Sequence, residues 1–206
     1  VDIGLVPIYA VLNKPKYKLF SDYCIGALND VRTVTLLSNG PLSSIKKVYL
    51  DNHSKTSANL IKVLAKFYWK IDIEWVTADI EKVKIPLPES EGMLAIGDKV
   101  FGLEQKFEHQ IDLAKEWHQF TGLPMVFAVW VTSKKLSTVL TEKFCKALAF
   151  GVENIPLAAE SLNGLKISHD EATHYLTKNI SYVLDKPKRD AIVLFEHYVN
   201  LMNPKE

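Results

Sequence analysis

The sequence predicts an α/β fold of two lobes that holds an anion between them. Residues 48–76 indicate a strand, a helix and a second strand, because β-forming runs flank apolar residues at helical spacing. Residues 125–131, MVFAVWV, are almost continuously apolar, which is typical of a strand buried on both faces. At 206 residues the chain can bury a full core in one large domain or in two lobes.

Short apolar runs between turn residues predict the other strands, at residues 1–6, 23–27, 31–38, 73–76 and 93–96. In the first of these runs only Asp2 is polar, and Pro7 ends it. Residues 79–91 contain two prolines and no sustained period, so we expect an irregular connection there.

Apolar residues at helical spacing predict helices that begin at Asp112, near Ser133, at Ser168 and near Asp185. Gly122 closes the first of them, and Ser168 with Glu171 forms a capping box. In the second helix four residues have the spacing of core positions: Leu140, Phe144, Ala147 and Leu148.

Composition and charge exclude several classes of function. The chain is 48% hydrophobic and 24% charged, with a formal charge of +1, so it lacks the basic excess that a nucleic-acid partner requires. No apolar run approaches the roughly 20 residues of a membrane helix. Arg32 and Arg189 are the only arginines, so lysines, hydroxyls and backbone N–H groups must hold an anionic ligand.

Several catalytic patterns are also missing from the sequence. It has no GxSxG, GxxxxGK[ST] or GxGxxG pattern, and its histidines do not have a metal-ligand spacing, so we expect no metal site. Cys24 and Cys145 lie in apolar settings without a CxxC pattern, which indicates two buried thiols in a reducing cytoplasm.

The junction between the strand at 48–50 and the following helix is the strongest candidate for a binding site. Ser54, Thr56 and Ser57 lie there with Lys55 among them, where the positive end of a helix attracts a carboxylate or phosphate. An ordinary helix cap explains the same residues. His53 precedes them and is a possible proton donor, although a surface loop histidine is the simpler interpretation.

Other candidates lie near predicted strand ends, where open α/β sheets bind ligands. Pro7 is a candidate wall of a pocket or an ordinary strand exit. Thr33 presents a hydroxyl to a cleft or is simply a good strand residue. Gly97 and Asp98 follow residues 93–96, where Asp98 orients a ligand hydroxyl or caps a turn.

Several segments of the sequence together have the pattern of one family. They are DIGLVP at 2–7, YCIGALNDVRTVTLLS at 23–38, HSKTS at 53–57, AIGDKVF at 95–101, DLAKEWHQFTGLPMVFAVWV at 112–131 and YLTKNISYVLD at 175–185. These segments resemble the chorismate dehydratases of the futalosine route to menaquinone. They span nearly the whole chain in the expected order, and the block with TGLP and VFAVW is the most specific.

The resemblance implies a fold like that of type II periplasmic binding proteins, with two lobes joined by two crossing strands. Residues 1–38 and 127–206 would form one lobe, and residues 39–126 the other. Members of the family carry a further strand, loop and helix before DIGLVP, so we expect an N-terminal segment to be missing from this sequence. The resemblance further implies no cofactor, a cytoplasmic location and a monomer or homodimer.

The resemblance also assigns a substrate and roles to residues. Chorismate, a small dicarboxylate, would lose water, with Thr33 as the catalytic residue that orients it. Because no strong general base stands out in the sequence, our hypothesis is that the substrate's own side-chain carboxylate takes the proton. Substrate-binding residues would be Pro7, Ser54, Thr56, Ser57, Gly97 and Asp98. Two alternatives stay open: the sister enzyme that makes 1,4-dihydroxy-6-naphthoate, and a solute-binding protein without activity.

Overall fold

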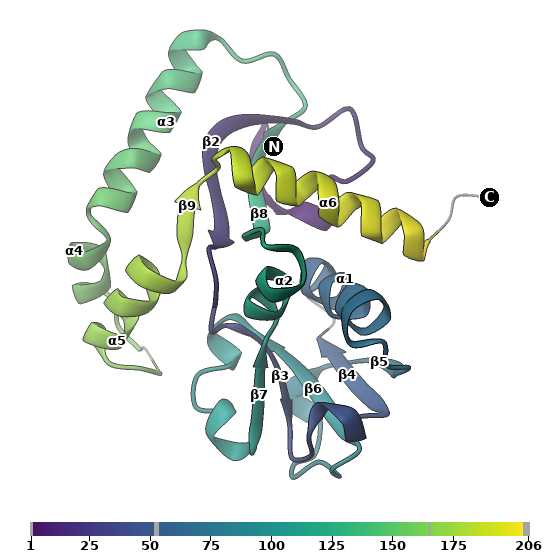
Figure 1. Cartoon of the computed structure of the whole chain (residues 1–206). Helices are drawn as coiled ribbons and strands as arrows, with labels where there is room; N and C mark the ends of the chain where they lie inside the picture. Colours follow the sequence, from purple (N-terminus) through teal and green to yellow (C-terminus); the bar gives the residue numbers. More distant parts are fainter. Residues whose placement is uncertain (1, 52–53, 165, 204–206) are drawn as a thin grey trace.

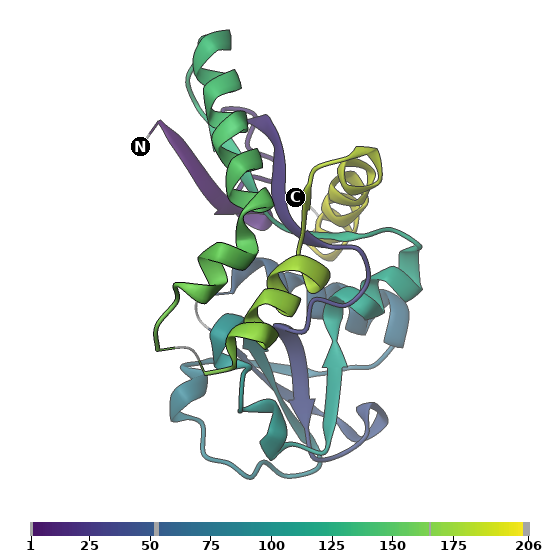
Figure 2. The ribbon, with the colours of Figure 1, turned by 90° about the vertical axis from the view of Figure 1, so that its left-hand side faces the viewer.

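The computed structural model describes residues 2–51, 54–164 and 166–203, which form two β-sheets with helices between and beside them (Figure 1). The four-stranded sheet lies in the upper half of Figure 1 and the five-stranded sheet in the lower half. Turning the molecule by 90° leaves the two sheets one above the other (Figure 2). The predicted two-lobed α/β class is therefore confirmed.

The upper sheet has the strand order β1 (Ile3–Pro7), β8 (Met125–Thr132), β2 (Lys18–Ala27), β9 (Ser181–Val183), and its pairs are antiparallel. The apolar run predicted to be buried on both faces is β8, a central strand of this sheet. It pairs with β1 through Gly4 and Val131, and with β2 through Gly26 and Val126. The continuous apolar pattern fits the burial of this strand, whose residues are all buried or half-buried.

The lower sheet has the order β5 (Glu74–Ala78), β4 (Lys47–Asp51), β6 (Glu91–Ile96), β3 (Val34–Ser38), β7 (His109–Asp112). β4 runs parallel to β5 and β6, whereas β3 is antiparallel to β6 and β7. The strand, helix and strand predicted from residues 48–76 are β4, α1 (Lys55–Val63) and β5. Every residue of β3 is buried, because strands flank it and side chains pack on both its faces.

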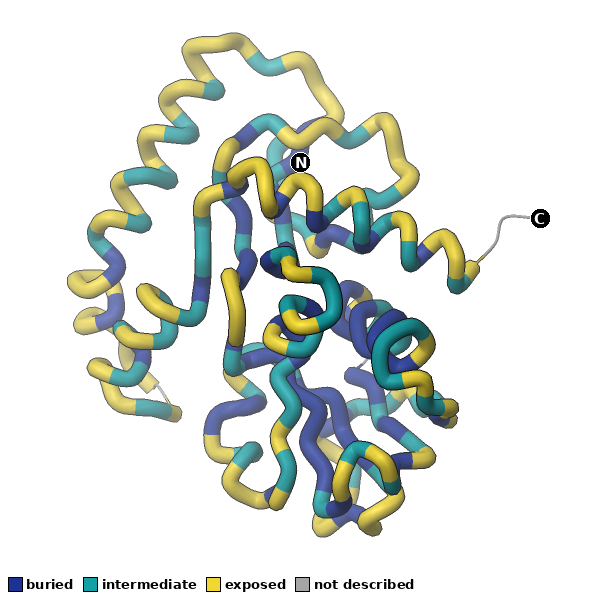
Figure 3. Tube along the Cα trace, in the orientation of Figure 1, coloured by how far each residue is buried: buried dark blue, intermediate teal, exposed yellow. Residues whose placement is uncertain are grey.

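The helices α1 and α2 (Leu113–Thr121) lie between the sheets, and α6 (Lys186–Met202) lies beside the upper sheet and contacts α1 (Figure 1). Trp117 of α2 is fully buried and packs edge-on against Phe195 of α6, with ring centroids 5.9 Å apart. One continuous apolar cluster includes Val129 of the upper sheet and Leu36 of the lower sheet. Both lobes therefore share a hydrophobic core, shown as the dark central region of Figure 3.

The helices α3 (Thr138–Glu153), α4 (Ile155–Glu160) and α5 (His169–His174) follow one flank of the molecule (Figure 1). The core positions predicted in α3 are not buried: Leu140 is 45% exposed, and no described residue of that helix is buried. Phe144 packs on Phe20 of β2 and Trp130 of β8, so α3 lies on one face of the upper sheet and has solvent on its other sides. Cys145 is likewise only half-buried, in contrast to the prediction.

Burial differs between the two thiols. Cys24 on β2 is buried as predicted, and that burial raises its pKa to about 12, so the thiol stays protonated.

In the part of the chain that is described, no helix has both the length and the apolar character needed to cross a bilayer.

The chain passes between the sheets twice. The first passage is at residues 28–33, between the end of β2 and the start of β3. The second is at residues 113–124, between β7 and β8, and it includes α2. The sequence-based boundaries, at 38/39 and 126/127, fall instead at the end of β3 and inside β8. An apolar run shows that a strand is buried, but it does not show which sheet the strand joins.

Candidate functional site

A cavity of about 260 Å³ lies between the two sheets. The end of β1, residues of the first passage, the start of α1 and the end of β6 all border it. It brings together six of the predicted site residues: Pro7, Thr33, Ser54, Thr56, Ser57 and Gly97. Residues up to 90 positions apart in the sequence thus meet at a position typical of α/β ligand sites.

The first wall of the cavity is the start of α1. Ser54, Thr56 and Ser57 are 6%, 4% and 4% exposed, and all three line the cavity. The Thr56 hydroxyl accepts a hydrogen bond from Tyr9 N at 3.3 Å and donates to Phe127 O at 3.4 Å. Both distances exceed the usual 2.9–3.0 Å, so these bonds are weak and the hydroxyl can turn to a ligand.

Backbone donors add to this wall. Ser54 is the N-cap residue, but its side chain accepts no hydrogen bond from the first turn of α1. The first N–H groups of a helix have no acceptor within the helix, so here they remain available to a ligand. The positive end of the helix dipole favours a carboxylate or phosphate at the same place, and the exposed Lys55 adds a cation nearby.

The second wall is built around Thr33 and Tyr175. Their hydroxyl oxygens lie 2.8 Å apart, and both residues line the cavity. The Thr33 carbonyl accepts a hydrogen bond from Gly97 N at 2.8 Å, which ties the passage between the sheets to the end of β6. Gly97 has φ +57°, a conformation that suits glycine. The Tyr175 ring packs edge-on against Phe101, with centroids 5.5 Å apart.

Burial raises the pKa of Tyr175, and the nearby negative charge of Asp98 raises it further. The phenol therefore remains protonated at neutral pH. Asp98, a predicted site residue, is exposed and does not line the cavity, although it acts on Tyr175 through its charge. His53, the possible proton donor of the sequence-based prediction, lies outside the described residues.

An ion pair holds the second wall in place. The Arg32 guanidinium contacts Glu171 of α5 at 2.5 Å and Glu104 of the lower lobe at 3.3 Å, and it lies over the Phe101 ring. Those two carboxylates raise the Arg32 pKa, although burial acts in the opposite direction. Arg32 thus connects α5 to the lower lobe beside the cavity.

A single carboxylate fixes the first passage between the sheets. Asp112 accepts hydrogen bonds from the backbone N–H groups of Val31 and Arg32 at 2.9 and 2.5 Å. Its other oxygen accepts from Ala114 N and Lys115 N at 2.9 and 3.1 Å and so caps α2. Burial raises the Asp112 pKa in spite of these four bonds. One side chain therefore joins both passages between the lobes.

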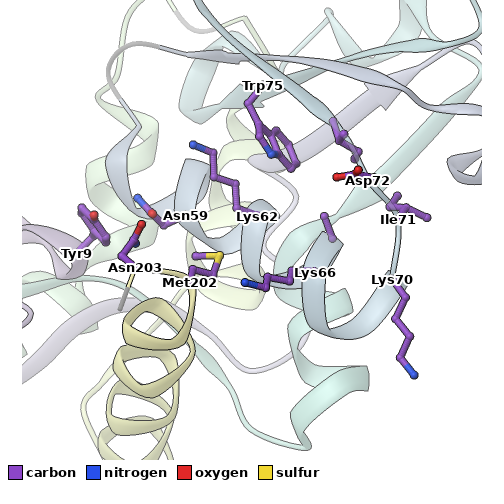
Figure 4. A pocket seen from close by; sticks show the side chains of 12 residues that line it. Tyr9, Asn59, Lys62, Lys66, Lys70, Ile71, Asp72, Trp75, Met202 and Asn203 are labelled. Carbon is purple, nitrogen blue, oxygen red and sulfur yellow. The ribbon is translucent and has the colours of Figure 1, made fainter. Parts of the chain in front are cut away.

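A larger hollow, of about 850 Å³, lies on another face beside α1 and the end of α6 (Figure 4). Lys62, Lys66 and Lys70 line it, and the Lys62 ammonium lies 5.9 Å from the centre of the Trp75 ring. Lysines four residues apart are the ordinary solvated face of an amphipathic helix. This hollow has neither a helix start nor a cluster of hydroxyls, so the smaller cavity is the candidate site.

Within the described residues, no group of three or more His, Cys, Asp or Glu side chains is arranged to hold a metal ion. The described side chains around the cavity are mostly apolar or carry hydroxyls, and the ionisable ones are Lys55 and Tyr175. The arrangement can therefore bind a small anion at one wall and offer hydroxyl donors at the other.

Tyr175 is the site residue that the sequence did not single out. It lies in a segment that resembles the family, but 142 positions separate it from Thr33. The one local signal is its spacing of four from Glu171, which places both residues on one helix face. That spacing shows that the two residues share a helix face, but it does not show which residues contact that face. The contacts of Arg32 and Thr33 with Glu171 and Tyr175 could therefore not be predicted from the sequence.

Fold and site together define a two-lobed α/β protein with a cavity between its lobes. A crystal structure of a protein from Archaeoglobus fulgidus has the same fold, with a TM-score of 0.70 and 16% identity over 98% of this chain and 79% of that one. A putative nitrate transport protein from Thermoplasma volcanium has a TM-score of 0.56 and 15% identity, over 98% and 77%.

A family model described as menaquinone biosynthesis matches residues 1–200, so the chain belongs to that family. The chain is also similar to the chorismate dehydratase of Thermus thermophilus. The two are 27% identical over 223 residues, which cover 98% of this chain and 80% of the relative. The predicted family is therefore confirmed.

Proposed function

We propose that this protein is a chorismate dehydratase, a lyase that removes water from chorismate and yields 3-[(1-carboxyvinyl)oxy]benzoate. The supporting observation is the cavity itself, in which a helix start suited to a carboxylate shares one space with the Thr33 and Tyr175 hydroxyls. Membership of the menaquinone biosynthesis family and the similarity to the Thermus thermophilus chorismate dehydratase point the same way.

In this proposal the first wall binds a substrate carboxylate through Thr56, Ser57 and the backbone N–H groups of α1. Ser54, Pro7 and Gly97 shape the space around it, and Asp98 contributes through its charge. Thr33 orients the ring from the opposite wall. The two lobes would close over the substrate about residues 28–33 and 113–124 and so exclude water.

The reaction is strongly favourable in free energy because its product is aromatic, so the protein does not need to supply a driving force. A ring C–H bond and the neighbouring C–OH bond break, and a new ring double bond forms. The described residues around the cavity offer no carboxylate or imidazole as a base, so the side-chain carboxylate of chorismate takes the proton. Loss of water changes no oxidation state of the protein or of a carrier, so positioning and preorganised donors suffice.

The size of the cavity, about 260 Å³, suits one small acid. The sister reaction uses a cyclised futalosine product, and an assay with each substrate distinguishes the two.

The direct test incubates the purified protein with chorismate, without added cofactor. The expected result is loss of chorismate absorbance with formation of an equal amount of the benzoate product, identified by mass spectrometry. A matched variant, Ser137→Ala, changes a hydroxyl that caps α3 far from the cavity and should behave as the unmodified protein. Binding without conversion would instead indicate a solute-binding protein, and conversion of only the cyclised futalosine product would indicate the sister enzyme.

A further inference from the structure

Two contacts one helical turn apart fix Tyr175 at the cavity. Glu171 and Tyr175 are four residues apart and so lie on one face of the helical segment formed by α5 and the turn at Tyr175–Asn179. The consecutive residues Arg32 and Thr33 meet them in order: Arg32 pairs with Glu171, and Thr33 with Tyr175. Tyr175 is therefore held by the Thr33 hydroxyl and the Phe101 ring, and the ion pair fixes its helical segment one turn away.

Tyr175 is also the half-buried group around the cavity that can give up a proton. Of the ionisable side chains that line it in the described part of the chain, Lys55 is exposed, whereas Tyr175 is half-buried. The contact with Thr33 can be donated by either hydroxyl. When Thr33 donates to the phenol oxygen, the phenol proton is left for a group in the cavity.

We propose that the Tyr175 hydroxyl is a catalytic residue of the dehydration, the proton donor to the departing hydroxyl of chorismate. This inference rests on the proposed function. The C–O bond breaks with its electron pair on oxygen, the phenol proton joins that oxygen, and water leaves. The proton taken from the ring by the substrate carboxylate then returns to the tyrosinate, so protons balance and the enzyme is regenerated.

The acidity of the groups supports this direction of transfer. Burial raises the Tyr175 pKa above its ordinary value of about 10. The conjugate acid of the leaving hydroxide is water, which is a much weaker acid than a phenol. Transfer of the proton to the departing oxygen is downhill, and the phenol is fully protonated beforehand at neutral pH.

The decisive variant is Tyr175→Phe, which keeps the ring against Phe101 and deletes the hydroxyl. General acid loss typically costs about 100-fold or more, so we expect kcat for chorismate to fall by about 100-fold. Affinity for the benzoate product should change by less than about 2-fold, because that product lacks the departing hydroxyl. Tyr182→Phe is the matched control, since its hydroxyl donates to Leu176 O at 3.0 Å and Tyr182 does not line this cavity.

A second substrate separates proton donation from positioning. In a chorismate analogue with fluorine in place of the departing hydroxyl, fluoride leaves without needing a proton. The defect of Tyr175→Phe should then shrink to less than about 5-fold, whereas a merely structural role would leave it unchanged. Thermal unfolding of the variant shows whether it keeps the fold.

The outcomes distinguish the two proposals. If unmodified protein does not convert chorismate, the proposed function fails, and the donor role fails with it. If unmodified protein is active and Tyr175→Phe keeps its kcat, only the donor role is wrong. An equal loss of kcat for chorismate and for the fluoro analogue, with weaker product binding, would make Tyr175 a positioning residue instead.

Discussion

The two walls of the cavity are built in different ways. The α1 wall consists of neighbours in sequence, Ser54, Thr56 and Ser57, presented by the start of a helix. The opposite wall pairs Thr33 with Tyr175 across 142 positions, and Arg32 with Glu171 across 139. The first wall depends on local backbone geometry, whereas the second exists only when the C-terminal helices and the passage between the lobes meet.

This difference suggests that the α1 wall serves mainly to bind the substrate and that the opposite wall serves mainly the chemical step. A helix start offers several weak donors with a fixed direction, which suits capture of a carboxylate before the lobes close. A hydroxyl pair held by long-range contacts suits the step that needs one donor at one place. Substitutions in the first wall should therefore change affinity, and those in the second wall should change turnover.

The largest expected effect concerns the anchor beneath the second wall. Asp112→Ala removes the acceptor of four backbone N–H groups, which costs a helix cap and leaves two donors of the passage unpaired. We expect the free energy of unfolding to fall by about 3 kcal/mol. Loss of the helix cap accounts for about 1 kcal/mol of this, and loss of the bonds to Val31 and Arg32 accounts for the rest. Chemical denaturation followed by circular dichroism measures it.

Asp112→Asn sharpens this prediction, because the amide oxygen can still cap α2 while its NH₂ group faces the donors of Val31 and Arg32. Its expected loss is about half that of Asp112→Ala. Equal stability of the unmodified protein and Asp112→Ala would show that the four bonds contribute no net stability, and that the passage is held by packing alone.

The next largest effect tests the α1 wall as a binding surface. Thr56→Val together with Ser57→Ala removes two hydroxyls, and we expect chorismate binding to weaken by about 1–3 kcal/mol, the range for hydrogen bonds to charged groups. Calorimetry at constant salt measures it, with Ser137→Ala, a helix cap far from the cavity, as the control. Unchanged affinity would reduce this wall to an ordinary helix cap.

The ease of predicting each wall follows from the same difference. The strand, helix and strand around residues 48–76 and the central strand β8 were predictable, because local periodicity and burial agree there. The hydroxyls at the start of α1 were predictable for the same local reason. Tyr175 was not, because a single tyrosine in a helical segment carries no sign of its partner at position 33.

The α3 helix shows the converse limit. Its apolar spacing predicts a core helix, yet Leu140 and Phe150 are 45% and 67% exposed. Periodicity reports that one face is apolar, but only the tertiary structure decides how much of that face is covered. Here α3 meets one face of the four-stranded sheet along one side only, so the rest of its apolar surface stays exposed.

A smaller effect is expected from the ion pair that supports the second wall. In Glu171→Gln the shape is kept and the charge is lost, and the side chains of the pair are 32% and 38% exposed. Solvent screening limits such pairs to about 0–1 kcal/mol, so the free energy of unfolding should fall by less than about 1 kcal/mol. Turnover should fall by about 3- to 10-fold, because Tyr175 loses part of its support.

Asp190→Asn is the control for that variant, since Asp190 pairs with Lys186 on the exposed side of α6, away from the cavity. It should leave turnover unchanged. If Glu171→Gln keeps full turnover as well, the Phe101 and Thr33 contacts alone position the tyrosine.

The smallest effect is predicted for His53→Asn, which tests whether the α1 wall takes part in the chemistry. His53 precedes Ser54 in the sequence and is the possible alternative base. If the substrate carboxylate removes the proton, this substitution deletes no base, and kcat should fall by less than about 3-fold, far below the roughly 100- to 10,000-fold of a lost general base. Thr33→Val should lower kcat more, because it removes the hydroxyl that contacts Tyr175 and that, in the proposed function, orients the substrate. The measurement is kcat of both variants with chorismate as the substrate. If kcat falls by 100-fold or more for His53→Asn while Thr33→Val stays near the unmodified protein, the base lies beside the α1 wall. That wall would then take part in the chemistry as well as in binding.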